Sequence, residues 1–163
     1  MRHCIARLGL FMALALPVAA LAASVTWIAD QQGCKVANIS PQEGESVTWS
    51  GECEKGYASG EGTLTWYKNG VKTEVYEGMM AEGYAEGRGR LRRAGSMYVG
   101  EWKRSMQDGR GRYEDVDGSW YQGEWSEGQP HGLGQMMTPD GQLLRGYWNK
   151  GEFEDEGAMP HRT

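Results

Sequence analysis

Apolar and polar positions alternate along most of this chain, with aromatic residues and glycines at the apolar positions. Tyr98, Gly100 and Trp102 occupy alternate positions, and residues 121–125 repeat the same arrangement. A period of two places the aromatic residues on one face of an extended strand. The pattern therefore predicts β-strands.

These strands belong to a unit that occurs four times. Each unit opens with an aromatic residue, carries a glycine two positions later, and contains a Gly-x-Gly triplet that begins eleven positions after the aromatic residue. The opening residues are Trp49, Tyr76, Tyr98 and Tyr121, and the triplets begin at Gly60, Gly87, Gly109 and Gly132. Repeats of this length are supersecondary elements that bury a face only by stacking on their neighbours.

Turn signals separate the extended runs of successive units. Equivalent places are held by Asn69-Gly70, Ala94-Gly95, Asp117-Gly118 and Asp140-Gly141. Tight hairpin turns need positive φ, so these pairs predict β-hairpins. We expect an all-β fold, an elongated, twisted, single-layer antiparallel sheet of consecutive hairpins over residues 49–148, with four repeats and a closing strand.

The abundance of glycine needs its own explanation, because 25 of the 163 residues are glycine and glycine inside a strand normally weakens it. We interpret each glycine as a slot over which a Tyr or Trp ring from an adjacent strand lies flat. A phosphate-binding loop would need a strand, a glycine-rich turn and a helix, and that context does not accompany the triplets. The triplets are thus predicted to serve folding.

Residues 1–22 have the features of a cleavable signal peptide. Arg2 and Arg7 give a positive start, residues 8–16 are apolar, and Ala20-Leu21-Ala22 forms a small-residue cleavage site. We expect an exported protein, periplasmic or secreted. Residues 23–48 would form a cap segment before the repeats, and residues 149–163 an acidic tail.

Removal of the signal peptide leaves two cysteines, Cys34 and Cys53. In an oxidising compartment such a pair is expected to form a disulfide. The bond would staple the cap segment to the first repeat and cover the edge of the array. A redox-active pair is the alternative, but the sequence has no Cys-x-x-Cys.

The charge of the chain is acidic overall and basic in one place. The formal net charge is −5, which disfavours nucleic acid as a partner. Arginines nevertheless alternate along the second and third units and would align on the face opposite the glycines. We predict from them an anion site for a lipid headgroup, a phosphorylated ligand or an acidic partner. The site would comprise Arg88, Arg90, Arg110 and Arg112.

Cross-strand ion pairing is the alternative use of these arginines. Glu77, Glu101 and Glu124 should share their face if the hairpin register is regular.

The other face is predicted to be concave and lined by a row of rings. Rings stacked on glycine are structural, whereas rings with an open edge would form a groove for a peptide, or for a sugar or quaternary ammonium group. The predicted partner-binding residues are Tyr76, Tyr98, Trp102, Tyr121, Trp125 and Trp148.

Catalytic chemistry finds no support in the sequence. His131 lies before the fourth triplet at a place where the other units have Ser59, Glu86 and Asp108, as expected for a polar turn residue. Metal-ligand spacing and a nucleophile elbow are absent from the sequence. We therefore predict no enzyme, no catalytic residue, no metal site and no cofactor.

The recurring Tyr-x-Gly-Glu-Trp, Gly-x-Gly and Asp-Gly elements resemble the MORN repeat (membrane occupation and recognition nexus), most closely over residues 98–118 and 121–141. The resemblance covers about residues 47–148. Trp49, Cys53 and Met80 depart from the pattern. The resemblance implies a twisted sheet of hairpins that serves as an interaction scaffold, in a family linked to phospholipid binding, protein binding and dimerisation.

The sequence thus predicts an exported, bacterial-type, non-enzymatic binding protein. Its partner would be a protein, either a component of an envelope complex or a toxin that it neutralises, held in the aromatic groove. The alternative is binding of anionic lipid headgroups or an envelope polymer through the arginines. Glycan or choline binding ranks lower, because the Gly-Trp and Trp-Tyr-Tyr signatures of such repeats are missing. An exposed terminal strand would also permit a homodimer through the sheet edge.

Overall fold

The computed structural model describes residues 25–154, and the predicted signal peptide and the end of the predicted tail lie outside them. The described chain forms one sheet of thirteen strands. The strands are β1 (Thr26–Ala29), β2 (Lys35–Asn38), β3 (Glu45–Trp49), β4 (Glu52–Glu54), β5 (Tyr57–Lys68), β6 (Val71–Ala81), β7 (Tyr84–Arg93), β8 (Ser96–Lys103), β9 (Met106–Glu114), β10 (Trp120–Ser126), β11 (Gln129–Met137), β12 (Leu143–Asn149) and β13 (Glu152–Glu154).

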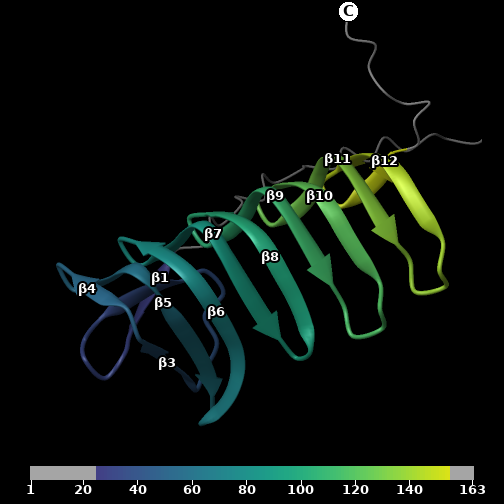
Figure 1. The fold of residues 1–163 in the computed structure, drawn as a ribbon. Coiled ribbons are helices and arrows are strands. Elements are labelled where there is room, and N and C mark those ends of the chain that lie inside the picture. Colours follow the sequence, from purple (N-terminus) through teal and green to yellow (C-terminus); the bar gives the residue numbers. More distant parts are fainter. Residues whose placement is uncertain (1–24, 155–163) are drawn as a thin grey trace, which may run out of the picture.

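The sheet is a row of hairpins in chain order. From β5 to β13 every strand pairs with the next one along the chain, always antiparallel, so the hairpins succeed one another along a single axis (Figure 1). This confirms the predicted fold. A single parallel bridge, between Lys35 of β2 and Tyr57 of β5, makes the sheet mixed.

The two faces of the sheet differ in composition. We define the inner face as the one that carries the rings of Tyr76, Tyr98 and Tyr121, which are 2–3% exposed. The outer face carries the residues that alternate with them, such as Arg90, which pairs with Val99 across β7 and β8. The repeated Tyr and Trp rings therefore gather on one face, and Arg88, Arg90, Arg110 and Arg112 lie on the other.

The two glycines of each Gly-x-Gly triplet have different roles. In the third unit the register of β8 with β9 shifts between Gly100 and Trp102. Gly109 falls in this bulge with φ of 100°, whereas Gly111 pairs regularly with Gly100. A glycine with positive φ is typical of one class of β-bulge. The sequence interpretation had given both glycines the same role, so for the first glycine of the triplet it was wrong.

The second glycine of each triplet leaves space for a neighbouring ring, as the sequence predicted. A Cβ atom at Gly111 would lie 2.5 Å from Cζ of Tyr98, and one at Gly89 would lie 2.5 Å from Cε2 of Tyr76. Each tyrosine ring thus covers the glycine of the next strand, and a methyl group there would overlap with it.

The N-terminal cap crosses the ends of the first hairpins. Trp27 of β1 packs edge to face against Tyr57 and Tyr84, with ring centroids 4.9 and 5.3 Å apart. Cys34 and Cys53 form the predicted disulfide, with 5.7 Å between their Cα atoms.

The last hairpin corrects a boundary. Residues 152–154 were assigned to the acidic tail, but they form β13, which pairs with β12. Phe153 packs on Trp148 with ring centroids 5.1 Å apart. The hydrophobic contact explains why this acidic segment joins the sheet.

Candidate functional site

The predicted partner-binding rings form one continuous stack along the inner face. Tyrosines and tryptophans alternate in it, with neighbouring ring centroids 5.1–5.3 Å apart and ring planes crossing at 76–87°. Edge-to-face packing of this kind is favoured by the charge distribution of aromatic rings. The stack contains Tyr76, Trp102, Tyr98, Trp125, Tyr121 and Trp148 in spatial order.

All six rings are 2–9% exposed, so they are the hydrophobic core of the repeats. The hydroxyl groups of the three tyrosines also form hydrogen bonds within the chain. The tyrosines donate to backbone carbonyl oxygens three residues ahead, Tyr76 to Met79 at 2.8 Å, Tyr98 to Glu101 at 3.0 Å and Tyr121 to Glu124 at 2.9 Å.

Burial changes the acidity of these tyrosines. Loss of solvation raises the pKa of Tyr121 to about 12, and the nearby Glu124 carboxylate contributes to the rise. Burial likewise raises the pKa of Tyr76 and Tyr98, helped by Glu86 and by Glu101 respectively. The phenols are therefore neutral hydrogen-bond donors at neutral pH.

A second set of inner-face residues is more accessible than the rings. They lie in register between the tyrosines: Leu91 pairs with both Tyr76 and Tyr98, and Tyr113 pairs with both Tyr98 and Tyr121. All of them are partly buried and pack against the core. We call this set the apolar strip; it consists of Leu91, Tyr113, Met136 and Leu144.

The sequence reasoning missed the apolar strip, although a signal was present. Leu91, Tyr113 and Met136 each stand two positions after the second glycine of a triplet, and on a strand that spacing puts them on the glycine's own face. The residue type at these positions varies from unit to unit, so they do not stand out in the repeat as the recurring aromatic residues do.

On the outer face, the cross-strand ion pairing that the sequence offered as the alternative is present for some of the arginines. Glu77 contacts Arg90 at 3.5 Å and Arg92 at 3.4 Å. Arg112 reaches Glu114 at 3.3 Å and lies over the ring of Trp120, 4.4 Å from its centroid. Arg90 and Arg112 are thus paired across or along strands.

Arg88 and Arg110 do not pair with an acidic side chain in this way. In register they face Glu101 and Glu124, respectively. Neither arginine makes an ion pair or side-chain hydrogen bond with residues 25–154.

The two glutamates turn instead toward the bulges. The Glu101 carboxylate lies where a side chain at Gly109 would sit, and Glu124 lies likewise at Gly132 and accepts from the amide of Leu133 at 3.3 Å. The bulged backbone therefore removes the acidic partners that regular pairing would supply.

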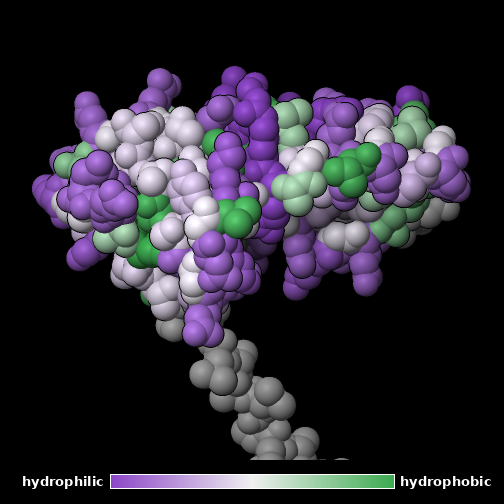
Figure 2. Space-filling view, turned by 90° about the horizontal axis from the view of Figure 1, so that it is seen from below, coloured by the Kyte–Doolittle hydropathy of each residue, from purple (hydrophilic) through white to green (hydrophobic). Residues whose placement is uncertain are grey.

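The unpaired arginines border two hollows on the outer face. Arg88 and Arg110 line a hollow of about 580 Å³ together with Glu77, Glu101 and the glycines Gly89 and Gly100. Arg110 also lines a neighbouring hollow of about 620 Å³, together with Arg145. In the view from below, hydrophilic side chains cover most of the surface, with small hydrophobic spots among them (Figure 2).

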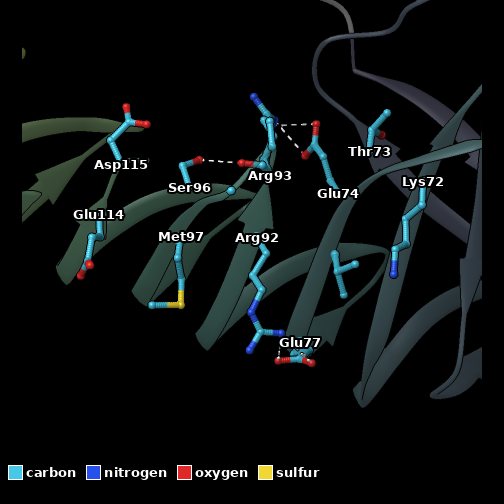
Figure 3. Close-up of a pocket in the computed structure, with 13 residues that line it drawn as sticks. Lys72, Thr73, Glu74, Glu77, Arg92, Arg93, Ser96, Met97, Glu114 and Asp115 are labelled. Atoms are coloured by element: carbon cyan, nitrogen blue, oxygen red, sulfur yellow. Dashed lines mark hydrogen bonds and ion pairs between the residues drawn. The ribbon is translucent and has the colours of Figure 1, made fainter. Parts of the chain in front are cut away.

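A third hollow, of about 590 Å³, lies where β6 and β8 begin and β7 and β9 end, and it carries both signs of charge (Figure 3). Arg93 contacts Glu74 there at 2.8 Å, and Arg92 points at Glu77. Acidic side chains outnumber unpaired cations in this hollow, so it does not favour an anion.

Other kinds of site were searched for within residues 25–154. No group of three or more potential metal ligands was found among them. The same residues include no helix with the length and apolar character needed to cross a bilayer. His131 lies beside Tyr147, with 6.0 Å between the ring centroids.

Comparison with known proteins identifies the repeats. The family model of the MORN repeat matches four segments, residues 49–71, 76–96, 98–120 and 121–143. Each match begins at one of the four aromatic residues that open a unit, and together the matches span more than half of the chain. A search of curated proteins gave no significant match. From the family match and from the row of glycine-slotted hairpins, this chain belongs to the MORN-repeat family.

Proposed function

We propose that this chain is an exported, non-enzymatic binding protein that holds a protein partner along its inner face. The carrying observation is the apolar strip of Leu91, Tyr113, Met136 and Leu144, half-buried and aligned across β7 to β12 beside the ring stack. Partly buried apolar groups on a rigid support suit protein recognition, because little side-chain entropy is lost on binding. The predicted signal peptide supports a partner in the bacterial envelope, a complex component or a toxin that is neutralised.

In this proposal the predicted aromatic residues do not contact the partner extensively; they support the residues that do. The rings of Tyr98, Trp102 and Trp125 support the apolar strip and hold it in place, while the strip makes most of the contact with the partner. Replacing a buried ring would therefore test folding, so substitutions in the strip give a cleaner test of binding.

We expect Tyr113→Ala combined with Met136→Ala to lower partner capture at least tenfold in a cross-linked pull-down from the periplasm. The physical reason is the loss of the accessible part of the apolar strip without removal of a ring from the stack. Val99→Ala combined with Leu133→Ala is the matched control, because both residues are apolar and exposed on the outer face. Equal capture by both double variants would contradict the proposal.

The second candidate is binding of an anionic lipid headgroup or envelope polymer on the outer face. It rests on the unpaired Arg88 and Arg110, which border one hollow and have lost their glutamate partners to the bulges. Arginine forks pair well with phosphate and carboxylate groups.

For this candidate we expect co-sedimentation with anionic vesicles that falls as salt is added, since salt screens exposed charges. Arg88→Glu combined with Arg110→Glu should abolish it. The control, Lys72→Glu combined with Lys150→Glu, makes the same charge change elsewhere on the exposed surface. Sedimentation that ignores both salt and the arginine variant would exclude this candidate.

A further inference from the structure

Three aromatic rings meet where the cap reaches the starts of β5 and β7. Trp27 of β1 contacts Tyr57 and Tyr84 edge to face, so neither tyrosine ring lies flat on the indole. Trp27 also covers the turn between β6 and β7, since a Cβ atom at Gly83 would be 2.7 Å from its Cζ3. Trp27 nevertheless stays 42% exposed, far more than any ring of the inner stack. The cluster therefore keeps aromatic surface open to solvent.

The repeat itself does not require this cluster. Tyr57 and Tyr84 each follow a turn of two residues with positive φ, and Met106 and Gln129 hold the same place after the next two turns. Within the described chain, a Cβ atom at the later turn glycine, Gly128, would meet no ring. The rings are thus gathered at one place in the array, at positions where the folding pattern leaves the residue type free.

A hollow of about 520 Å³ opens beside the three rings. Its other lining residues are two acids, two cations and a serine, namely Glu54, Glu82, Lys55, Arg104 and Ser59. The charges of the two signs balance, so these side chains give the hollow no net charge. It offers hydrogen-bond donors and acceptors side by side with ring surface.

Several of these polar groups have no partner within residues 25–154. The Tyr57 and Ser59 hydroxyls and the Glu82 carboxylate make no side-chain hydrogen bond or ion pair there, and Glu54 has only Lys55 at 4.0 Å. They can therefore exchange water for a ligand without breaking a bond within the described chain.

The two tyrosines already carry cations of the chain itself. Arg104 lies over the Tyr84 ring, 4.8 Å from its centroid, and Lys35 lies over the Tyr57 ring at 5.6 Å. A cationic ligand would have to displace these side chains to reach the tyrosine rings. An anionic ligand would face two carboxylates. The hollow therefore favours a neutral polar ligand.

Neutral sugars combine the properties that this lining suits. A pyranose ring presents C–H groups that pack on an aromatic ring, and its hydroxyl groups both donate and accept hydrogen bonds. Carboxylates accept from such hydroxyls, and arginine and lysine donate to them. A purely apolar ligand would instead cover the charged groups of the hollow without bonding to them, at a cost in desolvation.

We propose that this hollow binds one sugar residue of a neutral glycan. The C–H groups of the sugar pack on Trp27, and its hydroxyls donate to Glu54 and Glu82 and accept from Arg104. The hollow shares no residue with the apolar strip, so this inference does not rest on the proposed protein partner.

The first test presents the purified protein to immobilised trisaccharides of three charge types. The neutral ones are cellotriose, maltotriose, mannotriose and triacetylchitotriose, the acidic one is trigalacturonate, and the cationic one is glucosamine trimer. Binding should be confined to neutral sugars and should persist as salt is added, because no net charge is involved. If no neutral sugar is bound, or a charged one is preferred, the proposal is overturned and the rings serve only to dock the cap.

The second test assigns binding to the hollow, using in solution the neutral trisaccharide that binds. Trp27→Ala should weaken its affinity at least tenfold. Because this change could loosen the cap, Glu54→Gln combined with Glu82→Gln provides a second variant at exposed positions that leaves the rings in place. This double variant should also lose at least tenfold in affinity.

The matched control is Glu61→Gln combined with Glu127→Gln, which makes the same charge change at exposed positions away from the rings. Glu127 has φ of 50° in the turn position that Glu82 holds with φ of 48°. The control should bind the sugar as the unaltered protein does. Equal affinities of the two glutamine pairs, or full affinity of Trp27→Ala, would exclude this site.

Discussion

At the scale of single residues, each buried tyrosine of the ring stack serves the structure through several contacts at once. Each ring of Tyr76, Tyr98 and Tyr121 covers a glycine, contacts tryptophans and donates its hydroxyl to a carbonyl oxygen. The donated hydrogen bond requires the neutral phenol, and burial disfavours the phenolate.

This leads to a prediction about alkaline stability. Exposed or unfolded tyrosines ionise near a pKa of about 10, whereas burial raises the pKa of Tyr121 to about 12. Between these values the folded state keeps protons that the unfolded state loses, so the free energy of unfolding falls as the pH rises above about 10. Tyrosinate absorbance should show Tyr76, Tyr98 and Tyr121 ionising only with the loss of β-sheet circular dichroism.

The control for this titration is Tyr121→Phe, which removes one of the late-ionising groups. Ionisation of all tyrosines near pH 10 with the sheet intact would contradict the burial argument.

At the scale of elements, the hairpins are specified by two kinds of glycine. The second glycine of a triplet, such as Gly111, gives room to a ring, and the first, such as Gly109, allows the bulge. The bulge shifts the register of β8 against β9 and draws Glu101 away from Arg88. A backbone irregularity thereby exposes a charge that the sequence alone would pair.

We predict that Gly111→Ala destabilises the protein by about 3 kcal/mol, at the upper end for overpacking, because the new methyl group would overlap the Tyr98 ring. Gly118→Ala meets open space and should cost only about 1 kcal/mol, for its positive φ. Chemical denaturation of the two variants measures the difference. Equal losses would show that the ring does not occupy the slot.

At the scale of the whole molecule, the repeats form a linear array whose ends need covering. The cap and its disulfide cover the first hairpins, and β13 with Phe153 closes the other end. Because each hairpin contacts mainly its neighbours, the ends are where unfolding should begin.

Reduction of the Cys34–Cys53 disulfide should lower the free energy of unfolding by about 3 kcal/mol, since the bond closes a loop between residues 19 positions apart. Hydrogen exchange should then speed up first in β1 and β2. Loss of protection throughout the sheet at the same rate would show that the cap is not a separate unit. Oxidised protein in the same buffer without reductant is the control.

The sequence by itself determined the strands, the hairpin turns and the two faces. These follow from local rules, namely the period of two and turn chemistry such as that of Asn69-Gly70, so they can be read without coordinates. The disulfide could be predicted because only Cys34 and Cys53 follow the predicted signal peptide. Much of the candidate site could be named in the same way, including the ring row and the arginines.

Only the tertiary structure decided which of those residues are accessible. Burial of the rings depends on stacking between hairpins, and the unpaired state of Arg88 and Arg110 depends on bulges that shift the strand register. A cavity of about 320 Å³ is lined both by Asn38 and Ile39 of the cap and by Met80 of the hairpins, which are distant in sequence. Such properties arise from contacts between distant segments, whereas the fold arises from a pattern repeated within each one.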